Sequence, residues 1–309
     1  MGRAGVIKSR NLQDAAELED FARPSASLSV IVPVIDRITQ FPTTRYYGSK
    51  RKLLRWMYSH FGALRFDTVL DAFGGTGSVS LLFQAMNKSV TYHDGFRFNE
   101  DVARTVLSPT LALSRHQVEK NLNAVKSAEG VVTKYFDGIF YKPDENAWLD
   151  GFNLMLSETQ LSSQARSLLL YLIYQACLKK RPFNLFHRAN LSLRVNSDVK
   201  RSFGNAATWE RSFSHHALQA FDELTKANLG TRPSANILPA GDASDIRPGY
   251  DLVYIDPPYI NCEDRYNRDD YWRRYHFLEG LADYDNWATL IDPTSEVRLS
   301  PPSSWFVDW

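Results

Sequence analysis

Four consecutive residues in the C-terminal half could hold an amino group for reaction. Asp256, Pro257, Pro258 and Tyr259 (DPPY) follow the apolar run YDLVYI at 250–255, which predicts a buried strand. The prolines fix φ near about −65° and supply no backbone donor, so the Asp256 carboxylate and the Pro257 carbonyl project as rigid acceptors. Such a pair fits the two N–H bonds of an exocyclic amine, and Tyr259 offers a ring on which an extruded base can stack. The alternative is a proline-stopped strand with a surface aspartate.

A second candidate site is the glycine-rich stretch FGGTGS at 73–78. It joins a strand predicted at 67–72 to an apolar helix predicted at 79–86, and ligands of open α/β sheets bind at such junctions. Its glycines are Gly74, Gly75 and Gly77. Without a Cβ they let the backbone turn sharply and lie close to a ligand. The spacing is not that of pyrophosphate binders and no P-loop lysine follows, which argues against a nucleoside triphosphate. A tight turn without a ligand is the alternative.

Two aspartates at predicted strand ends could hold a nucleoside. Asp94 follows the strand predicted at 89–93 (SVTYH), where a carboxylate can accept hydrogen bonds from ribose hydroxyls. It could equally be a solvated strand end or cap the helix predicted at 99–107. Asp242 follows a strand candidate at 236–238 (NIL) and could either bond an adenine amino group or cap a turn.

The order of the predicted elements indicates the fold class. Strand, glycine-rich turn, helix and strand follow one another within about 30 residues, which begins a β-α-β unit and implies a parallel sheet. The chain then turns helical before the sheet pattern returns near residue 236. Helical patterns in the interruption are at 113–126, 161–178 and 214–228.

We therefore expect an α/β protein with a Rossmann-like sheet and a mainly helical insertion. The predicted catalytic domain comprises residues 41–110 and 231–309, the insertion residues 111–230, and an N-terminal arm residues 1–40.

Composition narrows the function classes. The chain has 309 residues, of which 44% are hydrophobic, which is enough for a large core. Its formal net charge of +1 does not by itself indicate a protein that binds nucleic acid. Cys177 and Cys262 are far apart, which argues against a zinc ribbon or disulfide framework, predicts no metal, and indicates a reducing compartment, the cytoplasm. The longest apolar run, 167–178, is too short to span a bilayer and predicts a buried helix rather than a membrane contact.

These motifs together resemble the Dam-type (α-group) adenine-specific DNA methyltransferases, in which a glycine-rich cofactor motif precedes DPPY and the DNA-recognition region lies between them. The matching stretches are YYGSK at 46–50, DAFGGTGS at 71–78, GDASD at 241–245 and DPPY at 256–259. They are spread over roughly residues 43 to 280. Where the family often has an asparagine before the second-strand acid, this chain has His93.

The resemblance implies S-adenosylmethionine as the cofactor and N6 of adenine in double-stranded DNA as the methyl acceptor. Lys50 and its neighbours would contact the methionine end of the cofactor, Asp94 its ribose and Asp242 its adenine, while DPPY would hold the target base. The residues assigned in this way to the cofactor pocket are Tyr47, Lys50, Asp71, Phe73, Gly74, Gly75, Thr76, Gly77, Asp94 and Asp242.

Basic residues gather between 177 and 211, where eight lysines and arginines stand against two acidic residues, with aromatic residues between them. Such a segment can neutralise phosphates while its rings stack, and its asparagines can pair with adenine edges. A solvated face with an aromatic cluster is the alternative. The predicted DNA contacts are Lys179, Lys180, Arg181, Asn184, Arg188, Asn190, Arg194 and Arg201.

Three further expectations come with the resemblance. A restriction endonuclease encoded elsewhere would be a natural partner in a restriction-modification system. A cytosine-N4 methyltransferase, which more often carries serine at the position of Asp256, and a non-catalytic DNA-binding relative are the alternative functions. The family's sheet continues after DPPY, whereas here one helix at 271–282 is followed by a proline-rich tail, so the sheet is expected to be incomplete at the C-terminus.

Overall fold

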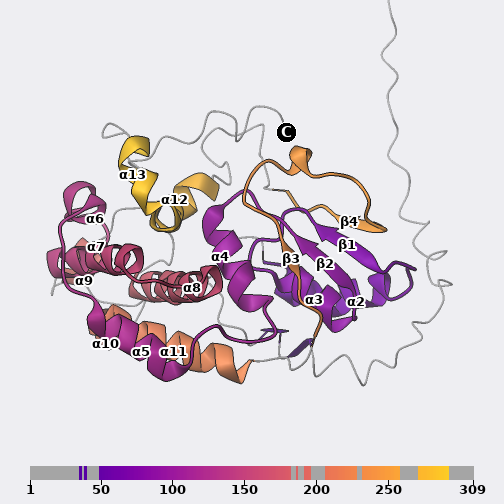
Figure 1. Cartoon of the computed structure of the whole chain (residues 1–309), viewed down its shortest axis with the longest axis horizontal. Coiled ribbons are helices and arrows are strands. Elements are labelled where there is room, and N and C mark those ends of the chain that lie inside the picture. Colours follow the sequence, from indigo (N-terminus) through magenta and orange to yellow (C-terminus); the bar gives the residue numbers. More distant parts are fainter. Residues whose placement is uncertain are drawn as a thin grey trace, which may run out of the picture.

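The structure is a computed structural model with a parallel sheet at one side and a block of helices at the other (Figure 1). It describes residues 35–36, 38–39, 49–181, 186, 191–195, 206–227, 232–257 and 271–291. None of the helices in these ranges is long and apolar enough to cross a membrane.

The sheet has four parallel strands in the order β3-β2-β1-β4. The strands are β1 (Thr68–Asp71), β2 (Ser89–Tyr92), β3 (Asn236–Ile237) and β4 (Leu252–Tyr254). All four were predicted, and so was their parallel arrangement. Because the strands are parallel, their carboxyl ends share one edge of the sheet, and the candidate site residues follow those ends.

Asp251 fixes the register between β1 and β4. Its Oδ2 accepts hydrogen bonds from the Thr68 amide at 2.9 Å, the Thr68 hydroxyl at 2.9 Å and the Asp67 amide at 3.0 Å. These bonds lower the pKa of the Asp251 carboxyl. Asp71 is thereby set opposite Tyr254, so the residues that follow β4 emerge beside the end of β1.

The β4 side of the sheet is open in the described part of the chain. Val253 and Ile255 expose 45% and 65% of their surface there, although both are apolar. Residues 258–270 and 292–309, which follow β4 in the sequence, lie outside the described residues. The incomplete sheet therefore stays a prediction.

Helix α3 (Ser78–Ala85) packs against β1 and β2, and helix α2 (Leu54–Phe61) packs against α3. Phe61 of α2 meets Phe83 of α3 at 4.9 Å between ring centroids and the ring of Tyr254 at 6.1 Å. A short 3-10 helix, η2 (Lys50–Leu53), leads directly into α2. The helix predicted after the glycine-rich turn is confirmed.

The helical block follows β2 and precedes β3 in the chain, as the predicted insertion required. Its helices are α5 (Arg115–Ala124), α6 (Val131–Tyr135), α7 (Pro143–Glu158), α8 (Ser163–Lys180), α9 (Ser192–Val195), α10 (Ala206–Glu210) and α11 (Phe213–Lys226). The sequence predicted α5, α8 and α11 but not α7. The exact domain boundaries stay predictions.

Helix α8 is the centre of the block, because its residues 167–178 are buried on every side, as their apolar run predicted. Ser162 caps the first turn of α8, because its hydroxyl accepts a hydrogen bond from the Ala165 amide. At 25 °C each fully buried leucine in such a helix contributes about 1.5–3 kcal/mol to stability.

Helix α4 (Arg97–Val106) joins the sheet to the block and lies between them in Figure 1. Its Asp101 accepts hydrogen bonds from Ser167 and Tyr174 of α8, each at 2.7 Å. At its start, the Arg97 and Phe98 amides donate at 3.1 Å to Glu279 of α12 (Tyr271–Ala282). Helix α13 (Tyr284–Leu290) follows α12. The described C-terminal helices are thus tied to the element that follows the site edge of β2.

Candidate active site

The glycine-rich turn lies at the carboxyl edge of the sheet between β1 and α3, and two of its glycines have specific reasons to be there. Gly77, the N-cap of α3, has φ +73°, a left-handed conformation that costs a residue with a Cβ about 1–2 kcal/mol. A Cβ on Gly74 would come within 2.1 Å of the ring of Tyr92, which is fully buried. Tyr92 also donates its hydroxyl to the Gly75 carbonyl at 2.6 Å. The turn is therefore packed tightly onto the end of β2.

Asp94 braces this turn from the end of β2. Its Oδ2 accepts from the Gly75 amide at 2.9 Å, and its Oδ1 accepts from the Phe96 amide and the Asn99 side chain, both at 2.9 Å. Burial raises the pKa of the Asp94 carboxyl, while these three donors act in the opposite direction. Asp94 thus supports the turn and the entry to α4, but it is not the cap of that helix, whose N-cap residue is Phe96. Its contact with a ribose stays a prediction.

Asp71, the last residue of β1, is completely buried below the same turn. Its Oδ2 accepts from the Ser80 hydroxyl at 2.6 Å, whereas its Oδ1 has no hydrogen-bond partner within the described part of the chain. Burial, with Asp94 and Asp256 nearby, raises the pKa of Asp71 to about 7. A buried acceptor with spare capacity is a place where a ligand donor or cation can bind.

Asp256 follows β4 by two residues and is paired with Lys50. The Lys50 ammonium contacts Oδ2 of Asp256, with 16% of the lysine side chain and 21% of the aspartate side chain exposed. These residues lie 206 positions apart in the sequence and are brought together because η2 begins next to the end of β4. The sequence reasoning assigned both residues to one site but did not foresee that they pair.

Asp242 lies in the loop after β3, which adjoins the end of β2 because the Gly241 amide donates to the Asp94 carbonyl at 3.3 Å. Its side chain is exposed and accepts from the Ser244 amide at 2.8 Å, capping the short helix η3 (Ala243–Asp245). This bond lowers the pKa of Asp242, and His93 adds a smaller effect in the same direction. His93 itself is buried, with Nδ1 2.9 Å from the Ala72 carbonyl. The turn cap weighed from the sequence is present, and a contact with the cofactor adenine stays a prediction.

The charges at this edge of the sheet suit a positively charged ligand. Asp94 and Asp256 are close enough to Asp71 to raise its pKa, and Lys50 contacts Asp256. An additional cation there would relieve the cost of the buried carboxylates. No group of acidic, histidine and cysteine residues in the described ranges is arranged to hold a metal ion, and none was predicted.

The structure describes some of the other predicted site residues and not the rest. Phe73 is half-buried, Thr76 is buried with its hydroxyl 3.0 Å from that of Ser78, and Pro257 is exposed. Tyr47, Pro258 and Tyr259 lie outside the described residues, so their predicted roles are untouched by the structure.

The predicted DNA-binding segment needs a correction. Lys180 and Arg194 are interior residues, with 1% and 0% of their side chains exposed. Both bind Glu145 of α7, Lys180 at 2.7 Å and Arg194 through two bonds of 2.8 and 2.9 Å. Lys180 also donates to the carbonyls of Trp209 and Arg211. These two cations hold helices together and do not face solvent, contrary to the expectation that they contact phosphates.

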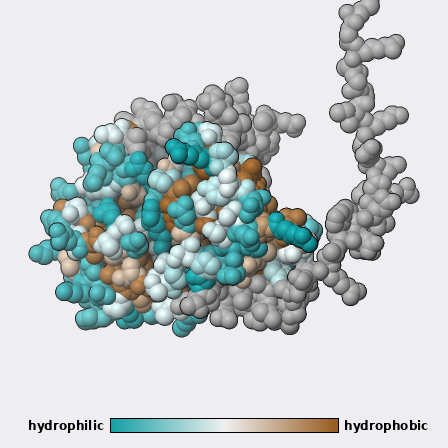
Figure 2. All heavy atoms as spheres, turned by 45° about the vertical axis from the view of Figure 1, so that its right-hand side comes forward, coloured by the Kyte–Doolittle hydropathy of each residue, from teal (hydrophilic) through white to brown (hydrophobic). Residues whose placement is uncertain are grey.

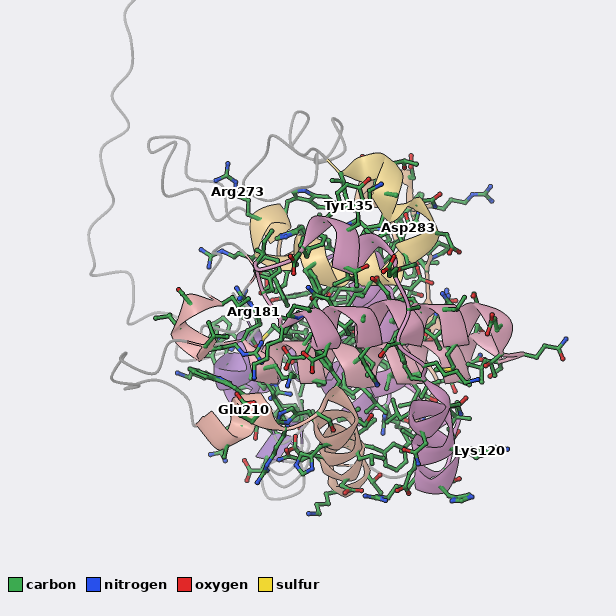
Figure 3. The ribbon with its side chains drawn as sticks, turned by 90° about the vertical axis from the view of Figure 1, so that its left-hand side faces the viewer. Lys120, Tyr135, Arg181, Glu210, Arg273 and Asp283 are labelled. Carbon is green, nitrogen blue, oxygen red and sulfur yellow. The ribbon has the colours of Figure 1, made fainter. Side chains whose placement is uncertain are left out.

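Arg181 is also buried, between aromatic rings. Its guanidinium lies 4.3 Å from the ring centroid of Phe140 and 5.1 Å from that of Phe186, and burial lowers its pKa to about 10. Figure 3 shows Arg181 among the helices, whereas Lys120 stands at the outer edge of the molecule. Lys179 is partly exposed and pairs with Glu223 at 3.1 Å. The remaining predicted contacts, which lie outside the described residues, are Asn184, Arg188, Asn190 and Arg201.

A parallel α/β sheet with a glycine turn after β1, carboxylates after β1 and β2, and an aspartate-proline pair after β4 defines a Rossmann-like methyltransferase. The family model for D12 class N6 adenine-specific DNA methyltransferases matches residues 46–286, well over half of the chain. The chain therefore belongs to this family, enzymes that methylate N6 of adenine in DNA. No curated protein and no solved structure gives a significant match.

Proposed function

We propose that the methyl donor is S-adenosylmethionine, held at the carboxyl edge of the sheet, and that the acceptor adenine lies in double-stranded DNA. When bound, this donor supplies a methyl group already activated on a positively charged sulfonium. The observation that carries the proposal is the cluster of Asp71, Asp94 and Asp256 around the glycine-rich turn. A cationic donor with a ribose and an amino group suits this combination of carboxylates and close backbone.

The glycine-rich turn and the two aspartates beside it would each have a role in holding the donor. Gly74, Gly75 and Gly77 let the donor approach the backbone, and Asp94 holds the turn in shape while offering carboxylate oxygens at the strand end. Oδ1 of Asp71, which has no partner among the described residues, is a candidate acceptor for a donor N–H or a cationic group. These roles are positioning and electrostatic ones, which account for much of the catalysis in group transfers with an activated donor.

Asp256 and the Pro257 carbonyl would hold the adenine amino group. Two acceptors facing the two N–H bonds draw electron density onto the nitrogen, which conjugation with the ring otherwise makes a weak nucleophile. Pairing with Lys50 keeps the Asp256 carboxylate fixed in direction until the amino group arrives. Tyr259 would stack on the extruded base, a role predicted from sequence.

Asp256→Ala tests this assignment. The full-length variant is mixed with unmethylated genomic DNA and S-adenosylmethionine that carries a tritiated methyl group, and incorporation is followed with time. We expect transfer to fall at least about 1,000-fold, because positioning and electrostatic effects of this kind are that large. Binding of S-adenosylmethionine, followed by calorimetry, is expected to persist.

A matched variant and a product analysis make the result specific. Asp137→Ala removes an exposed aspartate between α6 and α7 and is expected to retain wild-type transfer. Digestion of the product to nucleosides should give N6-methyl-2′-deoxyadenosine; N4-methyl-2′-deoxycytidine would instead support the alternative acceptor. Retained turnover by Asp256→Ala would refute the role of Asp256, and cofactor binding without transfer by the wild type would favour a non-catalytic DNA-binding protein.

Two wider predictions rest on the family resemblance. A restriction endonuclease as a partner would be tested by mapping methylated adenines in exposed DNA and asking whether an endonuclease cuts the same sequence when unmethylated. The cytoplasmic location stays a prediction from the cysteine content.

A further inference from the structure

The segment that precedes β1 contains an uninterrupted run of positive charge. Residues 37–66 hold no aspartate or glutamate, although the whole chain has almost equal numbers of acidic and basic residues. The cationic residues in this run are Arg37, Arg45, Lys50, Arg51, Lys52, Arg55 and Arg65. The overall charge of +1 therefore hides a strongly cationic segment.

Part of this segment forms a solvent-facing stripe on η2, α2 and the turn after it. Leu53, Trp56, His60 and Leu64 recur at the spacing of one helix face, and Trp56 exposes 61% of its surface. The Trp56 ring lies 4.1 Å from the ring of His60, so the stripe presents an ordered aromatic pair. Leu53 and Leu64 are 47% and 50% exposed at its two ends.

Cationic side chains flank this stripe. Lys52 and Arg65 are exposed at opposite ends of it, and no ion pair within the described ranges engages either. Arg55 is exposed too and forms a surface pair with Asp36 at 2.8 Å, which salt and solvent weaken. Arg51 is directed inward, donating to the Thr39 carbonyl, and burial lowers its pKa to about 10. Lys52, Arg55 and Arg65 therefore carry the outward charge.

The stripe begins next to the candidate active site. Lys50, two residues before Lys52, contacts Asp256, so one end of the stripe lies where the target base would be held. At a rise of about 2.0 Å per residue in η2 and about 1.5 Å in α2, the two helices from Lys50 to Phe61 are together about 20 Å long, and Arg65 lies in the turn beyond them. Duplex DNA carries one phosphate charge per about 1.7 Å of its axis, so a surface of this length spans several phosphates.

We infer that the exposed stripe of α2, formed by Lys52, Arg55, Trp56, His60 and Arg65, binds the backbone of duplex DNA beside the extruded adenine. The inference rests on the proposed function, since it supplies the substrate contact that the buried Lys180, Arg181 and Arg194 do not. Charge complementarity favours DNA as the occupant, because a stripe whose cations outnumber the neighbouring Asp36, with an exposed aromatic pair, matches phosphates and sugars. Figure 2 turns this side of the molecule forward and shows hydrophobic and hydrophilic surface interleaved there.

Fluorescence anisotropy with a labelled, mixed-sequence duplex tests the surface. The salt dependence of the affinity counts phosphate contacts, and each lost contact lowers the slope of log K against log salt concentration by about 0.9. Lys52→Ala/Arg65→Ala should therefore lower the slope by about 1.8. Trp56→Ala should weaken binding roughly tenfold at fixed salt, the effect of losing one aromatic contact. All three side chains altered here are exposed, and thermal melting checks that each variant folds.

Lys120→Ala, at an exposed position of α5 on the far side of the helical block, is the matched loss of a surface charge and should leave the slope unchanged. An unchanged slope in the double variant would overturn the inference, as would failure of the wild type to bind duplex. If the stripe instead binds a second copy of the chain, light scattering should show a dimer that Trp56→Ala converts to a monomer, while duplex binding persists. Methyl transfer measured on the same duplexes distinguishes this inference from the proposed function. If methyl is transferred but duplex binding does not depend on the stripe, only this inference is wrong. If duplex binding depends on the stripe but no methyl is transferred, only the proposed function is wrong.

Discussion

Asp71→Asn should stabilise the cofactor-free protein at alkaline pH while weakening its hold on the methyl donor. Asp71 is fully buried, and only its Oδ2 has a hydrogen-bond partner, the Ser80 hydroxyl, in the part of the chain that the structure describes. Asparagine keeps an acceptor for Ser80 and is nearly isosteric. It cannot ionise, so it removes the cost of a buried charge that lies close to Asp94 and Asp256.

The size and pH range of the effect follow from the pKa of Asp71. Its folded value, about 7, lies above the ordinary value of 3.8, so the folded state holds a proton that the unfolded state has released between these values. Stability attributable to this group is therefore complete below pH 3.8 and is lost as the pH rises through 7. The rise corresponds to at most about 4 kcal/mol, from which about 1 kcal/mol is subtracted for a weaker bond to Ser80. We expect Asp71→Asn to gain about 2–3 kcal/mol.

Urea unfolding of both proteins at about pH 5 and about pH 8.5 measures this gain, at roughly 1.4 kcal/mol for each tenfold change in the folding equilibrium. The advantage of the variant should grow with pH. Calorimetry should show weaker binding of S-adenosylmethionine by the variant at the higher pH, where the wild-type carboxylate is ionised. Asp137→Asn, at an exposed site, should change neither quantity. Equal free energies of unfolding for Asp71→Asn and wild type at both pH values would refute the reasoning.

Two other changes have clear expected results. Glu145→Ala leaves two buried cations without their carboxylate and should cost about 3–5 kcal/mol in urea unfolding, whereas Glu158→Ala, exposed at the end of the same helix, should cost less than about 0.5 kcal/mol; equal losses would contradict the structural role of Glu145. Lys50→Met removes the cation paired with Asp256 and should lower methyl transfer roughly tenfold, because the carboxylate is no longer held in place; unchanged transfer would show that this pairing does not control the reaction.

The sheet could be predicted because its signals are local. Short apolar runs bounded by glycine, proline or aspartate gave β1, β2, β3 and β4, and the β-α-β order gave their parallel arrangement. The glycine-rich turn could be predicted too, because glycine is needed where the backbone angle is left-handed or where the backbone packs closely, as it does here against Tyr92. Helix α7 was missed because hydrophobic and polar residues are mixed around it, although Pro143 at its first position with Glu145 two residues later is a helix-start pattern.

The basic segment was misjudged because burial is a property of the whole fold. Its excess of lysine and arginine could be counted in the sequence, but the partner that neutralises Lys180 and Arg194 is Glu145, about 35 and 49 residues earlier, in the helix that was not predicted. A charge balance over a short window omits such a partner. The same count over residues 37–66 finds the run without acidic residues, because that signal is local to the sequence.

The segment 37–66 contains both a residue that contacts the candidate active site and residues proposed to bind DNA. Lys50 faces inward to Asp256, while Lys52 and Trp56, half a turn and more along the same helical path, face solvent. If a duplex lies on the outer stripe, any movement of η2 that this contact causes is transmitted to the lysine that holds the carboxylate. The arrangement thus allows DNA contact to influence when Asp256 exchanges its bond with Lys50 for one with the adenine amino group. Methyl transfer by Lys52→Ala/Arg65→Ala at saturating duplex tests this link: a rate lowered as in Lys50→Met would support it, whereas a loss of duplex affinity at an unchanged rate would refute it.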